Sequence, residues 1–309
     1  MKRIGMLTSG GDCQSLNATM RGVVKGLNVL EGTVEIYGFI DGYKGLIYGN
    51  YKRLTSKDFS GILTTGGTIL GTSRQPFKLM RTPDENGLDK VEAMKSTYRY
   101  LDLDCLVVLG GNGSQKTANL LREEGLNIVS LPKTIDNDLM HIEYTPGYPS
   151  ACHYITTSLL EIAFDSMVYP IKSITIVEIM GRDTGWLTAS AQLVNEVYPQ
   201  MIDLIYMPEI IFDEDEFIEQ VMNKLQIKNN IFIVVSEGIK DKNGVCVSLD
   251  SGIQIDDFGH MSNSGCSYYL KKVIGKRLEI KVRSIQLSTL QRCAAHFASQ
   301  LDIENAILM

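Results

Sequence analysis

The sequence predicts an α/β protein made of two Rossmann-like, three-layer α/β/α domains with largely parallel sheets. Two observations lead to this class: short apolar runs alternate with longer helical stretches, and glycine-rich loops follow several of the runs. Such alternation favours parallel strands joined by helices that cover both faces of a sheet. The length of 309 residues and a hydrophobic content of 44% allow a large buried core.

The individual elements follow from the same pattern. Strands are expected at the apolar runs 4–7, 34–40, 61–64, 105–109, 128–131, 174–179, 204–207, 231–235 and 282–287. Helices are expected over 15–30, 88–100, 115–124, 186–196 and 214–225, and another begins near Ser150. A domain boundary is predicted near 140–150, where the segment YTPGYPS combines proline and glycine with aromatic residues. Ligands of open parallel sheets bind beyond the carboxyl ends of the strands, so a site is expected in the loops there.

Composition and charge argue against several classes of protein. The net charge is −6 and there is no basic block, so nucleic acid is not an expected partner. No apolar run approaches membrane-spanning length, and the start MKRIGMLTSGG lacks the apolar segment of a signal peptide, so no membrane is expected. The six cysteines are scattered without CxxC spacing, which argues against a zinc site or a disulfide framework. A cytoplasmic protein fits these properties.

Glycine-rich loops are expected after three of the strands. They read TSGGD at 8–12, TGGT at 65–68 and GGNGS at 110–114, and the second continues to Gly71-Thr72-Ser73-Arg74. Glycine lets the backbone approach a ligand, and N–H groups at the start of a helix attract phosphate. One such loop is often only a turn, but three at one sheet edge favour a phosphate site, where Arg74 could bind in a fork. The loops match neither the P-loop nor the G-x-G-x-x-G pattern.

Two carboxylates follow the strand expected at 128–131. The segment PKTIDND places Asp136 and Asp138 at the same sheet edge as the glycine loops. One interpretation is an Asx-rich turn that satisfies only its own backbone. The other is phosphoryl transfer, in which carboxylates bind Mg²⁺ or accept a proton from the attacking hydroxyl, and cations stabilise the transferred group.

Polar residues that suit this chemistry also follow strands in the second half of the chain. Arg182 in MGR and Glu237 in VVSEG each come at the end of a strand, and Arg283 and Arg292 lie in KVRSIQLSTLQR. A carboxylate such as Glu237 can bind sugar hydroxyls, and an arginine can bind a sugar phosphate. Taken singly, Glu237 or Arg292 would more often form a surface ion pair.

Together these motifs resemble those of the phosphofructokinase family. The segments GMLTSGGD, GGTILGTSR, GGNGS, PKTIDND, IVEIMGR, VVSEG and LQR occur in the family's order and at similar spacings, from Lys2 to about Leu308. The resemblance implies phosphorylation of the 1-hydroxyl of D-fructose 6-phosphate, giving fructose 1,6-bisphosphate in glycolysis, with Mg²⁺ as cofactor. It also implies a homo-oligomer, a tetramer or a dimer. The domains would be 1–148 with 290–309, which binds the phosphoryl donor, and 149–289, which binds the sugar phosphate, with the active site in the cleft between them.

The resemblance further implies roles for individual residues. Asp136 matches the catalytic base, Thr134 a position that contacts substrate and phosphoryl group, and Arg182 the residue that stabilises the transferring group. The positions that match donor-binding loops are Gly10, Gly11, Arg74, Gly111, Asn112, Gly113, Ser114 and Lys133. Those that match sugar-phosphate contacts are Thr134, Asp136, Met180, Gly181, Arg182, Glu237, Arg292 and, from a neighbouring subunit, Arg283.

Several positions depart from the family's pattern. Asn112 replaces a Mg²⁺-binding acid, and its amide oxygen can still ligate but carries no charge, so Asp138 is expected to bear more of the metal-binding role. Thr289 stands where a sugar-contacting histidine is common. Ser173 stands where a cross-subunit arginine is common, and Lys172 can replace that arginine only in part, as a point charge. The chain also ends at Met309, whereas family members normally continue further.

Two positions bear on the phosphoryl donor. Gly113 leaves room for a nucleotide, as in ATP-dependent members, whereas Lys133 replaces a glycine and often accompanies the use of pyrophosphate. Steric room is a strict condition and a lysine is compatible with either polyanion, so ATP is the expected donor and pyrophosphate the alternative. Arg21 and Lys25, one turn apart on the first helix, match a family effector site but equally a solvated basic face.

Two further interpretations compete with this one. Kinases of the NAD-kinase or diacylglycerol-kinase type also use a GG-D-G-containing loop, but they do not predict TIDND together with MGR and LQR. A catalytically weak phosphofructokinase-like protein with a binding or regulatory role is motivated by Asn112, Ser173 and Thr289. Turnover of fructose 6-phosphate by the wild-type protein and by Asp136→Asn would separate the enzyme from the regulatory protein.

Overall fold

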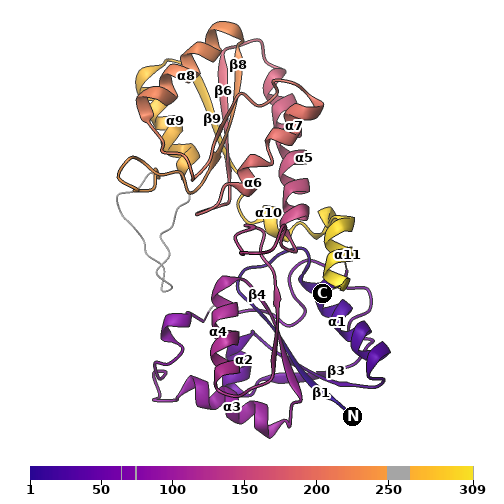
Figure 1. Ribbon diagram of the computed structural model, residues 1–309. Helices are drawn as coiled ribbons and strands as arrows, with labels where there is room; N and C mark the ends of the chain where they lie inside the picture. Colours follow the sequence, from indigo (N-terminus) through magenta and orange to yellow (C-terminus); the bar gives the residue numbers. More distant parts are fainter. Residues whose placement is uncertain (64, 74, 249–264, 309) are drawn as a thin grey trace. The chain divides into compact units, whose positions relative to one another are not determined.

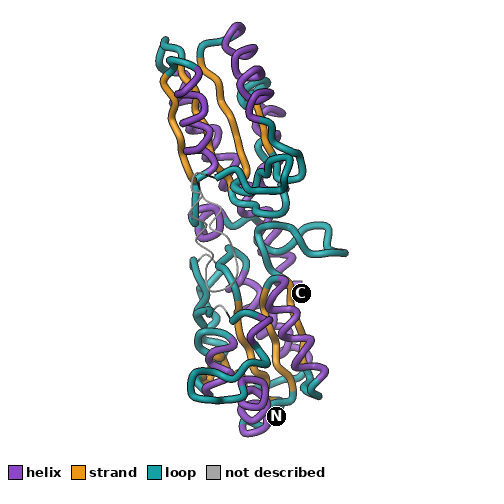
Figure 2. The backbone as a smooth tube through the Cα atoms, turned by 90° about the vertical axis from the view of Figure 1, so that its left-hand side faces the viewer, coloured by secondary structure: helices purple, strands orange, loops and turns teal. Residues whose placement is uncertain are grey.

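The structure is a computed structural model that describes residues 1–63, 65–73, 75–248 and 265–308. The chain forms two compact units, and each holds a sheet covered by helices (Figures 1 and 2). The first unit comprises Met1–Ile135, Leu139–Ser150 and Arg292–Met309, and the second comprises Asp136–Asp138 and Ala151–Gln291. The predicted class, a two-domain α/β protein with mostly parallel sheets, is confirmed. Among the described residues, no helix combines the length and apolar character needed to cross a membrane.

The first unit contains a five-stranded sheet in the order β3-β2-β1-β4-β5. Its parallel strands are β1 (Arg3–Ser9), β2 (Glu35–Phe39), β4 (Cys105–Gly110) and β5 (Ile128–Pro132), and β3 (Tyr51–Leu54) runs antiparallel at one edge. The central strands β1 and β4 are buried along almost their whole length, as expected for strands covered on both faces. The carboxyl ends of β1, β4 and β5 therefore meet at one edge of the sheet.

Helices cover both faces of this sheet (Figure 1). One layer contains α2 (Tyr43–Tyr48), α3 (Lys90–Tyr100) and α4 (Asn112–Glu123), whose apolar side chains share a hydrophobic core with β1, β2 and β4; the short η1 (Phe77–Leu79) lies beside α4. The other layer contains α1 (Leu16–Leu30) and α11 (Gln300–Leu308), preceded by η2 (Ala295–Phe297). These two helices are in close contact, because a Cβ added at Gly22 would lie 2.7 Å from the Cα of Ile307.

A buried carboxylate joins α11 to the start of α5 (Tyr148–Met167). Asp302 is 1% exposed and accepts hydrogen bonds from the N–H of Ser150 (2.8 Å), the N–H of Gly147 (2.9 Å) and the Ser150 hydroxyl. N–H groups at the start of a helix have no partner within the helix, so Asp302 satisfies donors that would otherwise be unpaired. Burial raises the pKa of Asp302, and the hydrogen bonds from Ser150 and Gly147 oppose this rise.

The second unit contains a parallel four-stranded sheet in the order β7-β8-β6-β9. Its strands are β6 (Ser173–Ile179), β7 (Leu204–Tyr206), β8 (Asn230–Ser236) and β9 (Lys281–Gln286). On one face, α8 (Glu214–Ile227) and α9 (Cys266–Arg277) share a hydrophobic core with the strands; the remaining helices are α5, α6 (Trp186–Ala189), α7 (Gln192–Val197) and α10 (Leu290–Cys293) (Figure 1). Asp213 caps α8, because its carboxylate accepts the N–H groups of Asp215 and Glu216.

Two expected elements differ from the structure, and one strand was not expected. The strand expected at 61–64 is wrong, since the described residues 61–63 form turns around Gly61, whose φ is 76°. The helix expected over 186–196 is divided into α6 and α7, where i→i−3 hydrogen bonds of Ala191 and Leu193 tighten the chain. The antiparallel strand β3 was not expected, because its central residues Lys52 and Arg53 are exposed at the sheet edge and give no apolar run.

Candidate functional site

Two cationic side chains lie over the glycine loop that follows β1. Lys133 is 6% exposed, and its ammonium donates a hydrogen bond to the carbonyl of Gly11. A Cβ added at Gly10 would lie 3.4 Å from Lys133 Nζ, and one added at Gly11 would lie 2.7 Å from a guanidinium nitrogen of Arg292. Glycine at both positions thus lets the two cations approach the backbone, which gives this loop a positive environment.

The second predicted glycine loop is tied to the first by side-chain hydroxyls. Thr72 Oγ1 donates to the carbonyl of Gly10 (2.8 Å), and Thr8 Oγ1 donates to the carbonyl of Gly71 (2.7 Å). The neighbouring segment is fixed by Asn17, which donates to the carbonyl of Thr65 (2.8 Å). The loops therefore lie together although the second does not follow a strand. Arg74, predicted to bind phosphate, lies outside the described residues.

The third loop leads directly into α4, which begins at Asn112. Gly110 must lack a side chain, because a Cβ there would lie 2.3 Å from the Cβ of Ser114. Ser114 is buried, and its Oγ would lie 3.9 Å from a Cβ at Gly10, so the first and third loops converge. A Cβ at Gly113 would meet no described atom within 4 Å. This arrangement leaves open space beside a helix N-terminus, where N–H groups favour an anion.

Asp12 is a residue of this site that the sequence reasoning did not single out. Burial raises the pKa of its carboxyl, whereas the N–H groups of Cys13 and Gly67 and the cations Arg292 and Lys133 oppose that rise. Its Oδ1 is buried and accepts no hydrogen bond from the described residues. Asp12 thus places a buried carboxyl group near the two cations. Its place in TSGGD, after the two glycines, was the available signal.

The segment TIDND contributes to both units. Thr134 belongs to the first unit, where it forms a parallel bridge with Gly147 and its carbonyl accepts the Thr145 hydroxyl (2.5 Å). Asp136 and Asp138 belong to the second unit, and Asp138 is exposed. The two carboxylates that the sequence placed after β5 thus group with the residues of the second sheet.

The loop after β6 is held in a single conformation by its contacts with the end of β8. Gly181 has a φ of 133°, and its carbonyl accepts the buried hydroxyl of Ser236. A Cβ added at Gly238 would lie 1.9 Å from the carbonyl oxygen of Arg182, so only glycine fits there. The N–H of Met180 donates to Gln291 Oε1 (3.1 Å). The backbone of the MGR segment is therefore fixed before any ligand binds.

Three predicted residues come together at this edge of the second sheet. The pKa of Glu237 is raised to about 7, chiefly by burial; the N–H of Gly181 and Arg182 oppose this rise, and the nearby carboxylates Glu178 and Asp136 add to it. Asp136, Arg182 and Glu237 are thus close enough to influence one another electrostatically. The Nε of Arg182 is buried and donates no hydrogen bond to the described residues, which leaves a cationic donor for an anionic ligand.

A second buried glutamate, Glu178, lies near Glu237. Glu178, in β6, accepts hydrogen bonds from the N–H of Ser267 (2.9 Å), the Ser267 hydroxyl (2.9 Å), the N–H of Gly265 (3.0 Å) and the Gln286 amide (3.2 Å). These bonds hold the start of α9 against β6 and β9. The sequence reasoning did not identify Glu178, because a carboxylate within an apolar strand gave no separate signal.

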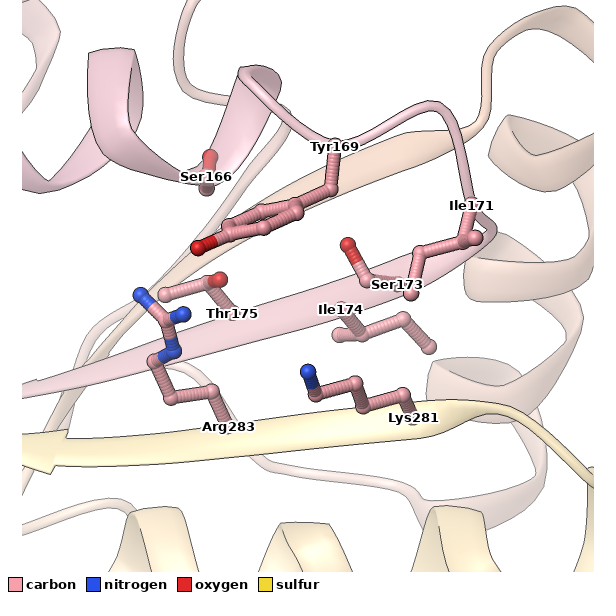
Figure 3. A pocket seen from close by; sticks show the side chains of 8 residues that line it. All are labelled: Ser166, Tyr169, Ile171, Ser173, Ile174, Thr175, Lys281 and Arg283. Atoms are coloured by element: carbon pink, nitrogen blue, oxygen red, sulfur yellow. The ribbon is translucent and has the colours of Figure 1, made fainter.

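Arg283 lies in a different part of the second unit. It pairs in register with Thr175, forms an ion pair with Asp165 and lines a small, open pocket (Figure 3). Lys281 and Ser173, which pair in register, also line this pocket. Lys172 was predicted to replace in part the arginine that is common at position 173, but it does not line the pocket. The cation that lies beside Ser173 is Lys281.

Each unit therefore gathers its own set of the predicted residues. In the first unit the set is Gly10, Gly11, Gly111, Asn112, Gly113, Ser114 and Lys133, and Arg292, predicted among the sugar contacts, joins it beside Gly11. In the second unit the set is Asp136, Met180, Gly181, Arg182 and Glu237, all near the carboxyl ends of β6 and β8. One set offers backbone N–H groups and cations that suit phosphates. The other offers carboxylates and a guanidinium that suit a reacting hydroxyl.

Comparisons with known proteins identify the family of this chain. The family model described as "Phosphofructokinase" matches residues 3–305. An ATP-dependent 6-phosphofructokinase of Spirochaeta thermophila is 43% identical over 299 residues, covering 94% of this chain and 78% of that protein. A pyrophosphate–fructose 6-phosphate 1-phosphotransferase of Amycolatopsis methanolica is 34% identical, covering 94% of this chain and 80% of that protein. The chain belongs to the phosphofructokinase family.

Solved structures with the same fold include a pyrophosphate-dependent phosphofructokinase from Nitrosospira multiformis. It superimposes with a TM-score of 0.82 at 25% identity, covering all of this chain and 74% of that one. The corresponding protein from Marinobacter aquaeolei gives a TM-score of 0.81, also at 25% identity, covering 99% of this chain and 73% of that one. The fold is thus shared with solved structures named as pyrophosphate-dependent phosphofructokinases.

Proposed function

We propose that this protein is a 6-phosphofructokinase, which transfers the terminal phosphoryl group of ATP to the 1-hydroxyl of D-fructose 6-phosphate. The observation that carries this proposal is the group formed by Asp136, Arg182 and Glu237, a base, a cation and a sugar-binding carboxylate at one sheet edge. The relatives named as ATP-dependent 6-phosphofructokinases support the substrate and the donor. The products are ADP and fructose 1,6-bisphosphate, and the step belongs to glycolysis.

The residues of the second unit serve the acceptor in this reaction. Asp136 accepts the proton of the 1-hydroxyl as its oxygen attacks the terminal phosphorus of the donor. The bond from that phosphorus to the bridging oxygen breaks, and Arg182 neutralises charge on the transferring group. Glu237 accepts hydrogen bonds from sugar hydroxyls, with its backbone position maintained by Cys266, whose Sγ donates to the Glu237 carbonyl (3.1 Å).

The residues of the first unit serve the donor. The N–H groups at the start of α4 and the cations Lys133 and Arg292 bind its phosphates. Open space at Gly113 supports ATP, and Lys133 is compatible with pyrophosphate, the alternative donor. Assays with each donor at equal concentration decide between them: robust turnover with pyrophosphate alone would exclude ATP.

Magnesium fits the available oxygen donors. Within the described residues there is no group of three or more histidine, cysteine, aspartate or glutamate side chains that could hold a metal ion alone. Mg²⁺ usually takes one or two protein ligands and several phosphate or water oxygens, so a full protein cage is not required. Asn112 and Asp138 are the residues that would hold it, and the ion would neutralise negative charge on the donor phosphates.

We further propose that the protein is a homo-oligomer in which Arg283 contacts the sugar phosphate bound by a neighbouring subunit. Exposed apolar side chains line the pocket of Arg283, namely Tyr169 at 49% and Ile171 at 48%, and Val168, next to Tyr169 in the chain, is 72% exposed. Single exposed apolar residues are common, whereas such a group favours an interface. Sedimentation analysis would show a dimer or tetramer, and a monomer at assay concentrations would exclude the proposal.

The test of the catalytic proposal compares the wild-type protein with Asp136→Asn. Removal of a general base is expected to lower kcat by about 10²–10⁴-fold, because the amide cannot accept the hydroxyl proton. Fructose 6-phosphate and Mg²⁺ are supplied with each donor, and fructose 1,6-bisphosphate is measured by a coupled assay. Equal and very slow turnover by both proteins would favour instead a phosphofructokinase-like regulatory protein. A strong preference for sedoheptulose 7-phosphate would replace the proposed acceptor.

A further inference from the structure

Thr184 connects the loop after β6 to the backbone of the proposed base. Its Oγ1 donates a hydrogen bond of 2.8 Å to the carbonyl oxygen of Asp136. Thr184 lies two residues after Arg182, and both belong to the same turn, which ends where α6 begins. One short segment therefore carries the cation and also contacts the backbone of the base.

The turn that carries Thr184 is rigid. The carbonyl oxygen of Thr184 would lie 2.5 Å from a Cβ at Gly181, and that of Arg182 would lie 1.9 Å from one at Gly238. At the end of the turn, the N–H of Gly185 donates a hydrogen bond to Glu209 Oε1 (2.6 Å), which fixes the backbone there. The Thr184 hydroxyl is thus presented from a fixed backbone.

The hydrogen bond from Thr184 acts on a peptide group with an unusual conformation. The carbonyl of Asp136 belongs to the peptide that joins it to Asn137, and Asn137 has a φ of 54°. This left-handed conformation is uncommon outside glycine and is best tolerated by asparagine and aspartate. Because the peptide plane sets the direction of the preceding Cα–Cβ bond, a hydrogen bond to this carbonyl helps to fix where the Asp136 carboxylate points.

We propose that Thr184 is a positioning residue, which holds the backbone of Asp136 in register with Arg182 so that the base acts on the acceptor hydroxyl and the cation on the phosphoryl group transferred to it. This inference rests on the proposed kinase function. It concerns the orientation of the base, since Thr184 bonds to a carbonyl of the main chain and not to the carboxylate. Misplacement of a reacting group by about 1 Å can cost about 10²-fold in rate.

The test uses Thr184→Val, which keeps the shape of the side chain and removes the hydroxyl. We expect kcat to fall by about 10- to 100-fold while KM for fructose 6-phosphate changes by less than about threefold. Thr184→Ser retains the hydroxyl and is expected to restore most of kcat. The matched control is Thr157→Val in α5, where the lost bond also runs from a threonine hydroxyl to a carbonyl, that of His153, at 2.8 Å; its kcat should equal that of the wild type.

A double-mutant cycle separates positioning from a general loss of structure. In the Asp136→Asn background the base is already absent, so Thr184→Val should cause no further loss of kcat. Equal losses in both backgrounds would overturn the inference, as would an unchanged kcat in Thr184→Val alone. Thermal unfolding of each variant, followed by the fluorescence of Trp186, identifies variants that do not fold. If Thr184→Val does not fold, Thr184→Ala takes its place in the cycle. Absence of turnover by the wild-type protein would instead refute the proposed function.

Discussion

The raised pKa of Glu237 leads to a prediction about stability against pH. The pKa rises from an ordinary value of 4.5 to about 7, chiefly because the carboxyl is buried. The folded state therefore retains a proton that the unfolded state loses above about pH 4.5. The stabilising contribution is fully present below pH 4.5 and is lost as the pH rises through 7. This shift corresponds to about 3 kcal/mol of free energy of unfolding.

The perturbation that isolates this contribution is Glu237→Gln, since glutamine resembles the neutral carboxyl at every pH. Between pH 5 and pH 9, we expect the free energy of unfolding of the variant to rise relative to that of the wild type by about 2–3 kcal/mol. Urea unfolding followed by tryptophan fluorescence is a suitable assay, because Trp186 is the only tryptophan and lies in the second unit with Glu237. An exposed glutamate of α8 provides the control variant, Glu219→Gln.

Two results would contradict this reasoning about Glu237. A difference between wild type and Glu237→Gln that stays constant from pH 5 to pH 9 would show that burial does not raise the pKa. A wild type that gains stability relative to the variant as the pH rises would show that hydrogen bonds and Arg182 outweigh burial. Glu219→Gln should follow the wild type in either case.

Three further predictions, one with a matched control substitution, have defined outcomes. Asp302→Ala should lower the free energy of unfolding by about 1–3 kcal/mol in urea titrations, because buried N–H and hydroxyl donors lose their acceptor; unchanged stability would contradict the capping role. Gly238→Ala should lower the free energy of unfolding by about 1–3 kcal/mol and remove activity, because the added Cβ displaces Arg182. In the control Gly275→Ala, the added Cβ meets no described atom within 4 Å, and the free energy of unfolding should rise by about 0.5–1 kcal/mol. Arg283→Met should raise KM for fructose 6-phosphate about tenfold in steady-state assays without lowering kcat, as expected for a lost charged hydrogen bond; an unchanged KM would remove Arg283 from the sugar-phosphate site.

The sequence was most informative where one strong physical signal dominated. Parallel strands buried on both faces, such as β1 and β8, appear as continuous apolar runs and were predicted nearly at their observed positions. Edge strand β3 lacks that signal, since its lysine and arginine are exposed. The apolar residues at 61–64 suggested a strand, but Gly61 adopts a turn conformation that a pattern of hydrophobicity does not encode.

The candidate site shows a similar limit. Residues that touch a ligand through glycine loops or charged motifs, such as Asp136 and Arg182, stand out in sequence. Residues that act through other residues do not, because Glu178 and Thr184 reveal their partners only after the strands are aligned. The environment of Arg292 also required the fold, which places its guanidinium beside Gly11, far away in sequence.

The contact between α1 and α11 has a consequence for the order in which the protein folds. These helices are neighbours in the first unit, yet the whole segment Ala151–Gln291 of the second unit separates them along the chain. During synthesis, the face of α1 that receives α11 must remain uncovered until the second unit has been made. Closing so long a loop costs conformational entropy before the contact between α1 and α11 can stabilise the unit. We therefore expect completion of the first unit to be a late and slow step of folding.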